Sequence, residues 1–119
     1  LEALSGYAYD AAKGTLRFQP QLGQGEFRCL FVATRGWGTY SQTLEGLRQV
    51  CQIELRYGSL ELKEIRVPQV LKNPKSLSIL LGKKALKGIS ISSKKGQITV
   101  KGDVRISGRQ ALLIVAEYR

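Results

Sequence analysis

The 119-residue sequence contains no histidine and no methionine. Without histidine it lacks the side chain that most often acts as a general base or a metal ligand, and Ser/His and Cys/His nucleophile pairs are excluded. No apolar run approaches the roughly 18 residues that span a membrane, and the first residues lack the basic start and apolar stretch of a signal peptide. These absences predict a binding or scaffold domain without catalytic residues, cofactor, metal or membrane span.

The missing methionine bears on the organisation of the chain. Because the sequence opens on Leu1 and has no methionine at any position, we expect it to be a fragment of a larger parent protein. Its length fits one domain, which would bury roughly 65% of the surface of its unfolded chain. We therefore expect a single globular domain over residues 1–119.

Cysteine is scarce as well. Cys29 and Cys51 are too few for a tetrahedral zinc site when histidine is absent. Small domains built on disulfides carry more cysteines, so a reduced origin such as the cytoplasm is favoured over an oxidising one. Both cysteines lie on the expected inward faces of strands, and we expect two buried, reduced thiols.

Acidic residues are rare in the second half of the chain. Residues 1–68 hold eight Lys/Arg and seven Asp/Glu, whereas residues 69–119 hold eleven and two, so most of the net charge of +10 lies there. This half is either a solvated polar face or a surface for polyanions. The candidate contacts are Lys83, Lys84, Lys87, Lys94 and Lys95. Because nearly all aromatic residues precede them, we expect salt-sensitive adhesion and no specific nucleic-acid recognition.

Short segments of alternating polarity, separated by Gly, Pro, Asn and Ser-Lys turns, dominate the sequence. This pattern is typical of antiparallel strands, and helix signals are nearly absent. About ten short strands predict an antiparallel two-sheet β-sandwich, with a closed β-barrel as the alternative. The expected strands are Gly6–Asp10, Thr15–Phe18, Glu26–Thr34, Trp37–Thr43, Leu47–Tyr57, Leu60–Val67, Leu77–Leu81, Ile89–Ser92, Gln97–Lys101, Val104–Ser107 and Ala111–Tyr118.

Four details of the strands concern their positions in the sheets. Glu26–Thr34 is apolar on both faces, which predicts a central strand covered on both sides. The polar tail of Trp37–Thr43 suggests an edge or a rim. In Leu47–Tyr57 the two end residues, Leu47 and Tyr57, share the inward face with Cys51. Gly58-Ser59 is read as a turn, and the apolar phase shift within Leu60–Val67 predicts a β-bulge.

The only tryptophan stands between two glycines, in Gly36-Trp37-Gly38, and Tyr40 follows shortly after. Two exposed aromatic rings would suit stacking on a sugar. Alternatively, Trp37 is a core or interdomain residue, and the glycines let another part of the backbone pass close by.

Carboxylates are the only acid/base groups available for catalysis. Glu61 and Glu64 are the closest pair in the most acidic stretch, and a glycosidase needs two such groups across a cleft. Their neighbours Lys63 and Arg66 make cross-strand charge pairing the simpler interpretation. We therefore expect no catalytic residue in this chain.

Four segments together resemble the β-rich tail of bacterial proteins related to family 116 glycoside hydrolases, the β-glucosidase and non-lysosomal glucosylceramidase group. They are Ser5–Asp10, Gly14–Pro20, Phe27–Phe31 and Gly36–Tyr40. In such proteins this tail follows an (α/α)6 catalytic barrel. The resemblance implies a noncatalytic accessory domain that packs on an upstream catalytic domain, whose own carboxylates lie outside this chain.

Three hypotheses follow for function. The first is the accessory domain of a glycoside hydrolase, with Gly36, Trp37, Gly38 and Tyr40 at the domain interface. The second is a carbohydrate-binding module in which Trp37 and Tyr40 stack on a sugar. The third is a polyanion- or nucleic-acid-binding module that uses the lysines of the basic half.

Overall fold

The structure is a computed structural model that describes residues 7–10, 12–18, 27–69, 74–86, 88–94 and 96–118. These residues form ten β-strands and no helix, which confirms the all-β class. The strands are β1 (Tyr7–Asp10), β2 (Thr15–Phe18), β3 (Phe27–Val32), β4 (Gly36–Glu45), β5 (Arg48–Pro68), β6 (Pro74–Leu81), β7 (Lys84–Ala85), β8 (Ser90–Lys94), β9 (Gln97–Ser107) and β10 (Ala111–Tyr118).

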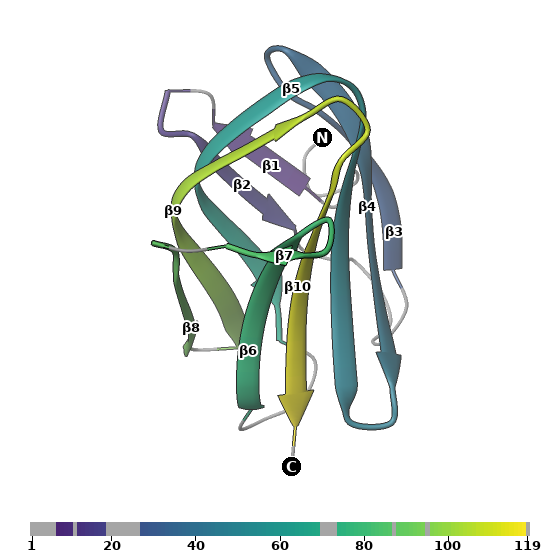
Figure 1. Ribbon diagram of the computed structural model, residues 1–119, viewed down its shortest axis with the longest axis vertical. Coiled ribbons are helices and arrows are strands. Elements are labelled where there is room, and N and C mark those ends of the chain that lie inside the picture. Colours follow the sequence, from purple (N-terminus) through teal and green to yellow (C-terminus); the bar gives the residue numbers. More distant parts are fainter. Residues whose placement is uncertain are drawn as a thin grey trace.

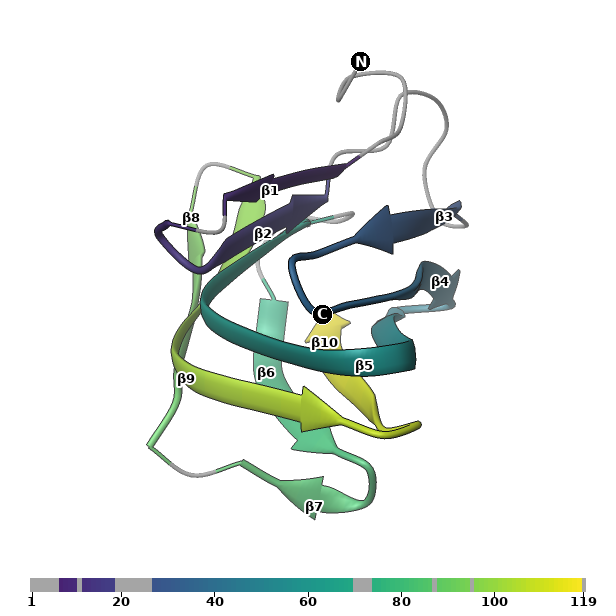
Figure 2. The same ribbon diagram turned by 90° about the horizontal axis from the view of Figure 1, so that it is seen from above.

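The strands form two layers that share β5 (Figures 1 and 2). Sheet A has the order β1-β2-β5-β9-β8, and sheet B has the order β3-β4-β5-β10-β6-β7. This arrangement confirms the predicted sandwich. The alternative of a closed barrel is wrong, because within the described ranges no hydrogen-bonded ladder joins β1 to β3 or β6 to β8. The sheet is also not wholly antiparallel, since β2 runs parallel to the end of β5.

Strand β5 is the element that the sequence pattern divided wrongly. The predicted turn at Gly58-Ser59 is a bend inside one strand of 21 residues, which Figure 1 shows curving from sheet B into sheet A. Gly58 has φ +82°, and a Cβ placed on it would lie 2.0 Å from the carbonyl oxygen of Arg35. Glycine is therefore required where the strand changes sheet. The predicted bulge is confirmed, since the register with β9 shifts between Leu62 and Glu64.

Two predictions about strand position are wrong. Within the described residues β3 pairs with β4 alone, so it is an edge strand, and its outward residues Leu30 and Val32 are exposed rather than covered. Strand β4 lies between β3 and β5, so it is an interior strand rather than an edge. Its polar residue Gln42 is buried there because the hydroxyl of Tyr40 donates a hydrogen bond to Oε1 of Gln42 at 2.8 Å.

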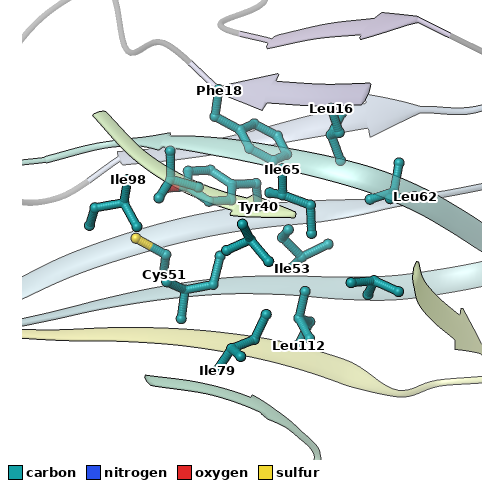
Figure 3. Packing of buried hydrophobic residues seen from close by; sticks show 14 of the residues in the cluster. Leu16, Phe18, Tyr40, Cys51, Ile53, Leu62, Ile65, Ile79, Ile98 and Leu112 are labelled. Carbon is teal, nitrogen blue, oxygen red and sulfur yellow. The ribbon is translucent and has the colours of Figure 1, made fainter. Parts of the chain in front are cut away.

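The core fills the space between the two sheets (Figure 3). Figure 3 shows the ring of Phe18, from β2, pointing toward Tyr40, from β4. The two rings stack at a centroid distance of 3.8 Å and an interplanar angle of 9°, and Phe31 meets Phe18 edge-on at 5.9 Å. This aromatic cluster packs sheet A against sheet B, because Phe18 belongs to one sheet and its two partners belong to the other.

A buried amide also joins distant parts of the fold. The Nε2 atom of Gln49 donates to the carbonyl oxygen of Pro68 at 2.8 Å and to Sγ of Cys51 at 3.3 Å. Its Oε1 atom accepts from the hydroxyl of Tyr118. Gln49 is the second residue of β5 and Pro68 is its last, so this side chain connects the two sheets through both ends of their shared strand.

Candidate functional site

The most distinctive surface is an aromatic row on the outer face of sheet B. Val32 of β3 is the register partner of Trp37 in β4, and Trp37 is the partner of Tyr57 in β5. We call Val32, Trp37 and Tyr57, together with the neighbouring Leu30, the aromatic row. Their exposed fractions are 62%, 43%, 66% and 60% respectively. Large side chains that share one face at this exposure form an apolar patch, and such patches commonly mark binding surfaces.

A β-bulge explains why Tyr57 belongs to this surface. Along β4 the register moves by one residue, from Gly38 to Trp37, while along β5 it moves by two, from Leu55 to Tyr57. The extra residue reverses the alternation, so Leu55 points into the core and Tyr57 points out. The prediction that Tyr57 shares the inward face of Cys51 is therefore wrong. At the other end of that face, Leu47 lies before β5 and is also exposed.

The glycines beside Trp37 allow the backbone of β4 to lie close to the backbone of β5. A Cβ on Gly36 would lie 2.3 Å from the carbonyl oxygen of Tyr57, and one on Gly38 would lie 2.2 Å from that of Glu54. Both distances are far too short for a real contact, so β5 can pair this closely with β4 only because these positions lack side chains. Gly36 and Gly38 thus place Trp37 opposite Tyr57 and present no side chain of their own to a partner.

Tyr40 does not join Trp37 on the surface. It is fully buried, stacked on Phe18, and points to the opposite face of β4. Residues three apart in a strand lie on opposite faces, so the spacing from Trp37 to Tyr40 excludes a shared platform in a regular strand. The predicted stacking pair is therefore wrong for Tyr40, and the exposed neighbour of Trp37 is Tyr57.

Three of the lysines proposed as polyanion contacts lie in two separate places. Lys83 and Lys84 lie at the turn between β6 and β7, and Lys94 lies at the end of β8. All three are exposed. Lys87 and Lys95 lie outside the described residues.

The two carboxylates considered for catalysis both face basic residues. Glu64 accepts a hydrogen bond from Nε of Arg66 at 2.5 Å, within the same strand. Glu61 is the register partner of Arg105 in β9. Within the described ranges, no three His, Cys, Asp or Glu side chains gather closely enough to hold a metal ion.

Both cysteines are free thiols, as predicted, and β4 separates their strands. Cys51 is buried, whereas Cys29 is only half-buried. Burial raises the pKa of the Cys29 thiol from 9.0 to about 11. Burial also raises the pKa of Cys51, although hydrogen bonds from Tyr40 and Gln49 act against the rise. The pKa of the Tyr40 hydroxyl is raised chiefly by burial and then by the nearby Cys51.

These shifts predict a loss of stability in alkali. Each of the three groups is held neutral in the folded protein but ionises near its ordinary pKa once unfolded, so unfolding releases protons above about pH 9. The free energy of unfolding should be insensitive to these groups below pH 9 and should fall as the pH rises from 9 toward 11. Urea denaturation at pH 7.5, 9, 10 and 11 measures this slope. Cys29→Ala should flatten it, and an unchanged slope in that variant would contradict the assignment to Cys29.

Comparisons with protein families, with curated proteins and with solved structures found no match for this chain. Nowhere in the described ranges is there a helix with the length and apolar character needed to cross a membrane.

Sequence reasoning identified Trp37 but missed the other members of the aromatic row. Strict alternation from Cys51 predicts an inward Tyr57, because alternation does not reveal the bulge between Leu55 and Tyr57. Apolar residues on both faces of β3 predict a covered strand, which would bury Leu30 and Val32. The signal that could have found them is their register with Trp37, which requires knowing that β4 lies between β3 and β5.

Proposed function

We propose that this chain is a noncatalytic accessory β-domain that docks on another protein domain through the aromatic row. The observation that carries the proposal is the exposed, cross-strand arrangement of Val32, Trp37 and Tyr57 on the outer face of sheet B. Aromatic side chains are enriched at the centres of protein interfaces, where they contribute much of the binding free energy.

The surroundings of the row have the polar rim that an interface of this kind requires. Arg56, the residue at the bulge next to Tyr57, pairs with Glu54 at 3.1 Å, and both lie at the outer surface. An aromatic residue can bury about 150–250 Å², so covering the exposed part of Trp37 alone would contribute about 2–3 kcal/mol. The apolar centre and charged border together favour a protein partner.

The resemblance to the tails of family 116 glycoside hydrolases gives the partner to test first, the helical catalytic domain of the parent protein. The noncatalytic character rests on the absence of histidine and on the basic neighbours of Glu61 and Glu64.

The single tryptophan makes docking measurable, because all tryptophan emission of this domain comes from Trp37 and the emission of the parent's remainder alone can be subtracted. In the isolated domain the emission should be that of a partly hydrated ring and should be quenched by acrylamide. Adding the separately produced remainder of the parent protein should shift the emission to shorter wavelength and protect it from quenching. Tyr57→Ser retains this reporter and should weaken docking by about tenfold or more, because it removes an interface aromatic ring.

Thr43→Ala is the matched control, because Thr43 is exposed on the same face of β4 but lies away from the row. It should dock like the unaltered domain. The proposal fails if the parent's remainder leaves the emission unchanged, or if Tyr57→Ser and Thr43→Ala weaken docking equally.

A second candidate function, carbohydrate binding, is favoured by the direct pairing of Trp37 with Tyr57. Two exposed aromatic rings on adjacent strands can stack on a sugar, in place of the pair with Tyr40. Titration with cellohexaose in the same emission assay distinguishes the two functions. A response to the oligosaccharide that Tyr57→Ser abolishes, together with none to the parent's remainder, would replace docking by sugar binding.

A further inference from the structure

The outer face of sheet A carries a basic hollow. It has a volume of about 1010 Å³ and is lined by residues of β1, β2, the second half of β5 and β9. Figure 2 shows these four strands side by side. Five cationic side chains and two carboxylates line it, so their formal charges, five positive and two negative, leave a net +3. The cations are Lys13, Arg17, Lys63, Arg66 and Lys101.

The register of three strands brings these cations together. Arg17 in β2 is the direct partner of Arg66 in β5, and Lys101 in β9 is the partner of Glu64. The bulge in β5 adds Lys63, because the backbone N–H groups of Lys63 and Glu64 both donate to the carbonyl oxygen of Gly14, at 2.7 and 3.2 Å. The bulge therefore fixes Lys63 beside the hairpin turn that carries Lys13.

The two carboxylates of the hollow already have partners. Oδ1 of Asp10 accepts hydrogen bonds from the backbone N–H groups of Ala12 and Lys13, at 3.1 and 3.3 Å. Glu64 is held by Arg66 at 2.5 Å.

Among the described residues, no further carboxylate forms an ion pair with the remaining cations of the hollow. Across the described ranges the only other ion pair is that between Arg56 and Glu54. Lys13, Arg17, Lys63 and Lys101 thus have no ion-pair partner there, although Arg17 is half-buried. Like charges on directly paired residues destabilise a sheet, as at Arg17 and Arg66, and a bound anion would relieve that repulsion.

We propose that the hollow binds a small ligand that carries two or more phosphate or sulfate groups. Neighbouring strands lie about 4.8 Å apart, and alternate residues on one strand lie about 7 Å apart, so the cations form a grid that suits several oxyanions on one molecule. Arginine guanidinium groups bind such oxyanions through paired hydrogen bonds. Tyr9 is the one aromatic residue among the described residues that line the hollow, and it packs against the core, which argues against stacked nucleobases.

This site is independent of the docking proposal, because it lies on the other sheet and shares no residue with the aromatic row. It also differs from the lysines expected from the sequence, since four of its five cations come from residues 1–68. The net charge of residues 1–68 is close to zero, so charge counted along the chain does not indicate this site.

Calorimetric titration of the domain at 0.15 M salt tests the proposal with two probes, tripolyphosphate and a trisulfated heparin disaccharide. We expect saturable binding of at least one probe, and the tighter of the two identifies phosphate or sulfate as the preferred group. Arg17→Gln should weaken binding by about tenfold or more, because a charge-assisted hydrogen-bond donor is lost. Glu64→Gln should strengthen binding, because it frees the Arg66 guanidinium.

Lys84→Gln is the matched control, since it removes the same charge from an exposed position outside the hollow. It should change the affinity less than twofold. The urea midpoint of Arg17→Gln should equal or exceed that of the unaltered domain, because the repulsion with Arg66 is relieved. Equal losses in Arg17→Gln and Lys84→Gln would show attraction to net charge alone and overturn the site, as would the absence of binding to both probes at 0.15 M salt.

Discussion

Phe18→Ala should lower the free energy of unfolding by about 3–5 kcal/mol, the range measured when a buried aromatic residue is truncated. The ring is fully buried, stacks on Tyr40 at 3.8 Å and meets Phe31 edge-on at 5.9 Å. Because Phe18 is on sheet A and its two partners are on sheet B, the cavity would open between the sheets, where neither backbone can close it. Urea denaturation followed by far-ultraviolet circular dichroism measures the change.

Two further variants separate the contribution of the ring from those of its neighbours. Tyr57→Ala removes an aromatic side chain that is exposed on the outer face, so it should cost less than about 1 kcal/mol. Tyr40→Phe keeps the stacked ring but removes the hydroxyl that donates to Gln42, which should cost about 1–2 kcal/mol. If Phe18→Ala costs no more than Tyr57→Ala, the aromatic cluster does not join the two sheets.

The parts of the fold that the sequence predicted well depend on local alternation. The strands β1, β2 and β10 and the inward position of Cys51 each follow from a two-residue apolar period bounded by turn residues. In these segments, burial of one face decides the register, and no distant pairing is needed to recognise it.

The errors in strand boundaries arise at glycines, which occur both in turns and in bends within a strand. The sequence predicts a turn at Gly58, but in the structure its positive φ bends a continuous strand. Gly58 still pairs with Gly36 of β4, and the next residue, Ser59, already pairs with β9. Likewise, the strands predicted at Gln97–Lys101 and Val104–Ser107 are one strand, with Gly102 inside it. A glycine indicates that the backbone can adopt a positive φ, but it does not distinguish a turn between two strands from a bend within one strand.

The two candidate sites depend on pairings that no local pattern contains. Val32, Trp37 and Tyr57 become neighbours only through the order β3-β4-β5, and Arg17 meets Arg66 only because β2 runs parallel to the end of β5. The apolar character of Leu30 and Val32 was correctly seen. Alternation alone does not reveal whether another strand covers a face, so the exposure of these two residues follows only from the position of β3 at the edge of the sheet.

The remaining prediction concerns the glycines that allow β5 to approach β4. Gly38→Ala should lower the free energy of unfolding by about 2–4 kcal/mol, because its Cβ would lie 2.2 Å from the carbonyl oxygen of Glu54 and one of the two backbones must move. Gly58→Ala should cost at least as much, since its Cβ would lie 2.0 Å from the carbonyl oxygen of Arg35 and the residue has φ +82°. Urea midpoints of the variants measure both.

Gly46→Ala isolates the contribution of φ alone. Gly46 has φ +60°, but a Cβ there would have nothing within 4 Å, so only the left-handed backbone opposes alanine and the cost should be about 1–2 kcal/mol. The expected order of destabilisation is therefore Gly58, then Gly38, then Gly46. Since Gly38 adjoins Trp37, its replacement should also change the tryptophan emission, whereas Gly46→Ala should not. If Gly46→Ala and Gly38→Ala lower the free energy of unfolding equally and neither changes the emission, the close approach of β4 and β5 does not position Trp37 beside Tyr57.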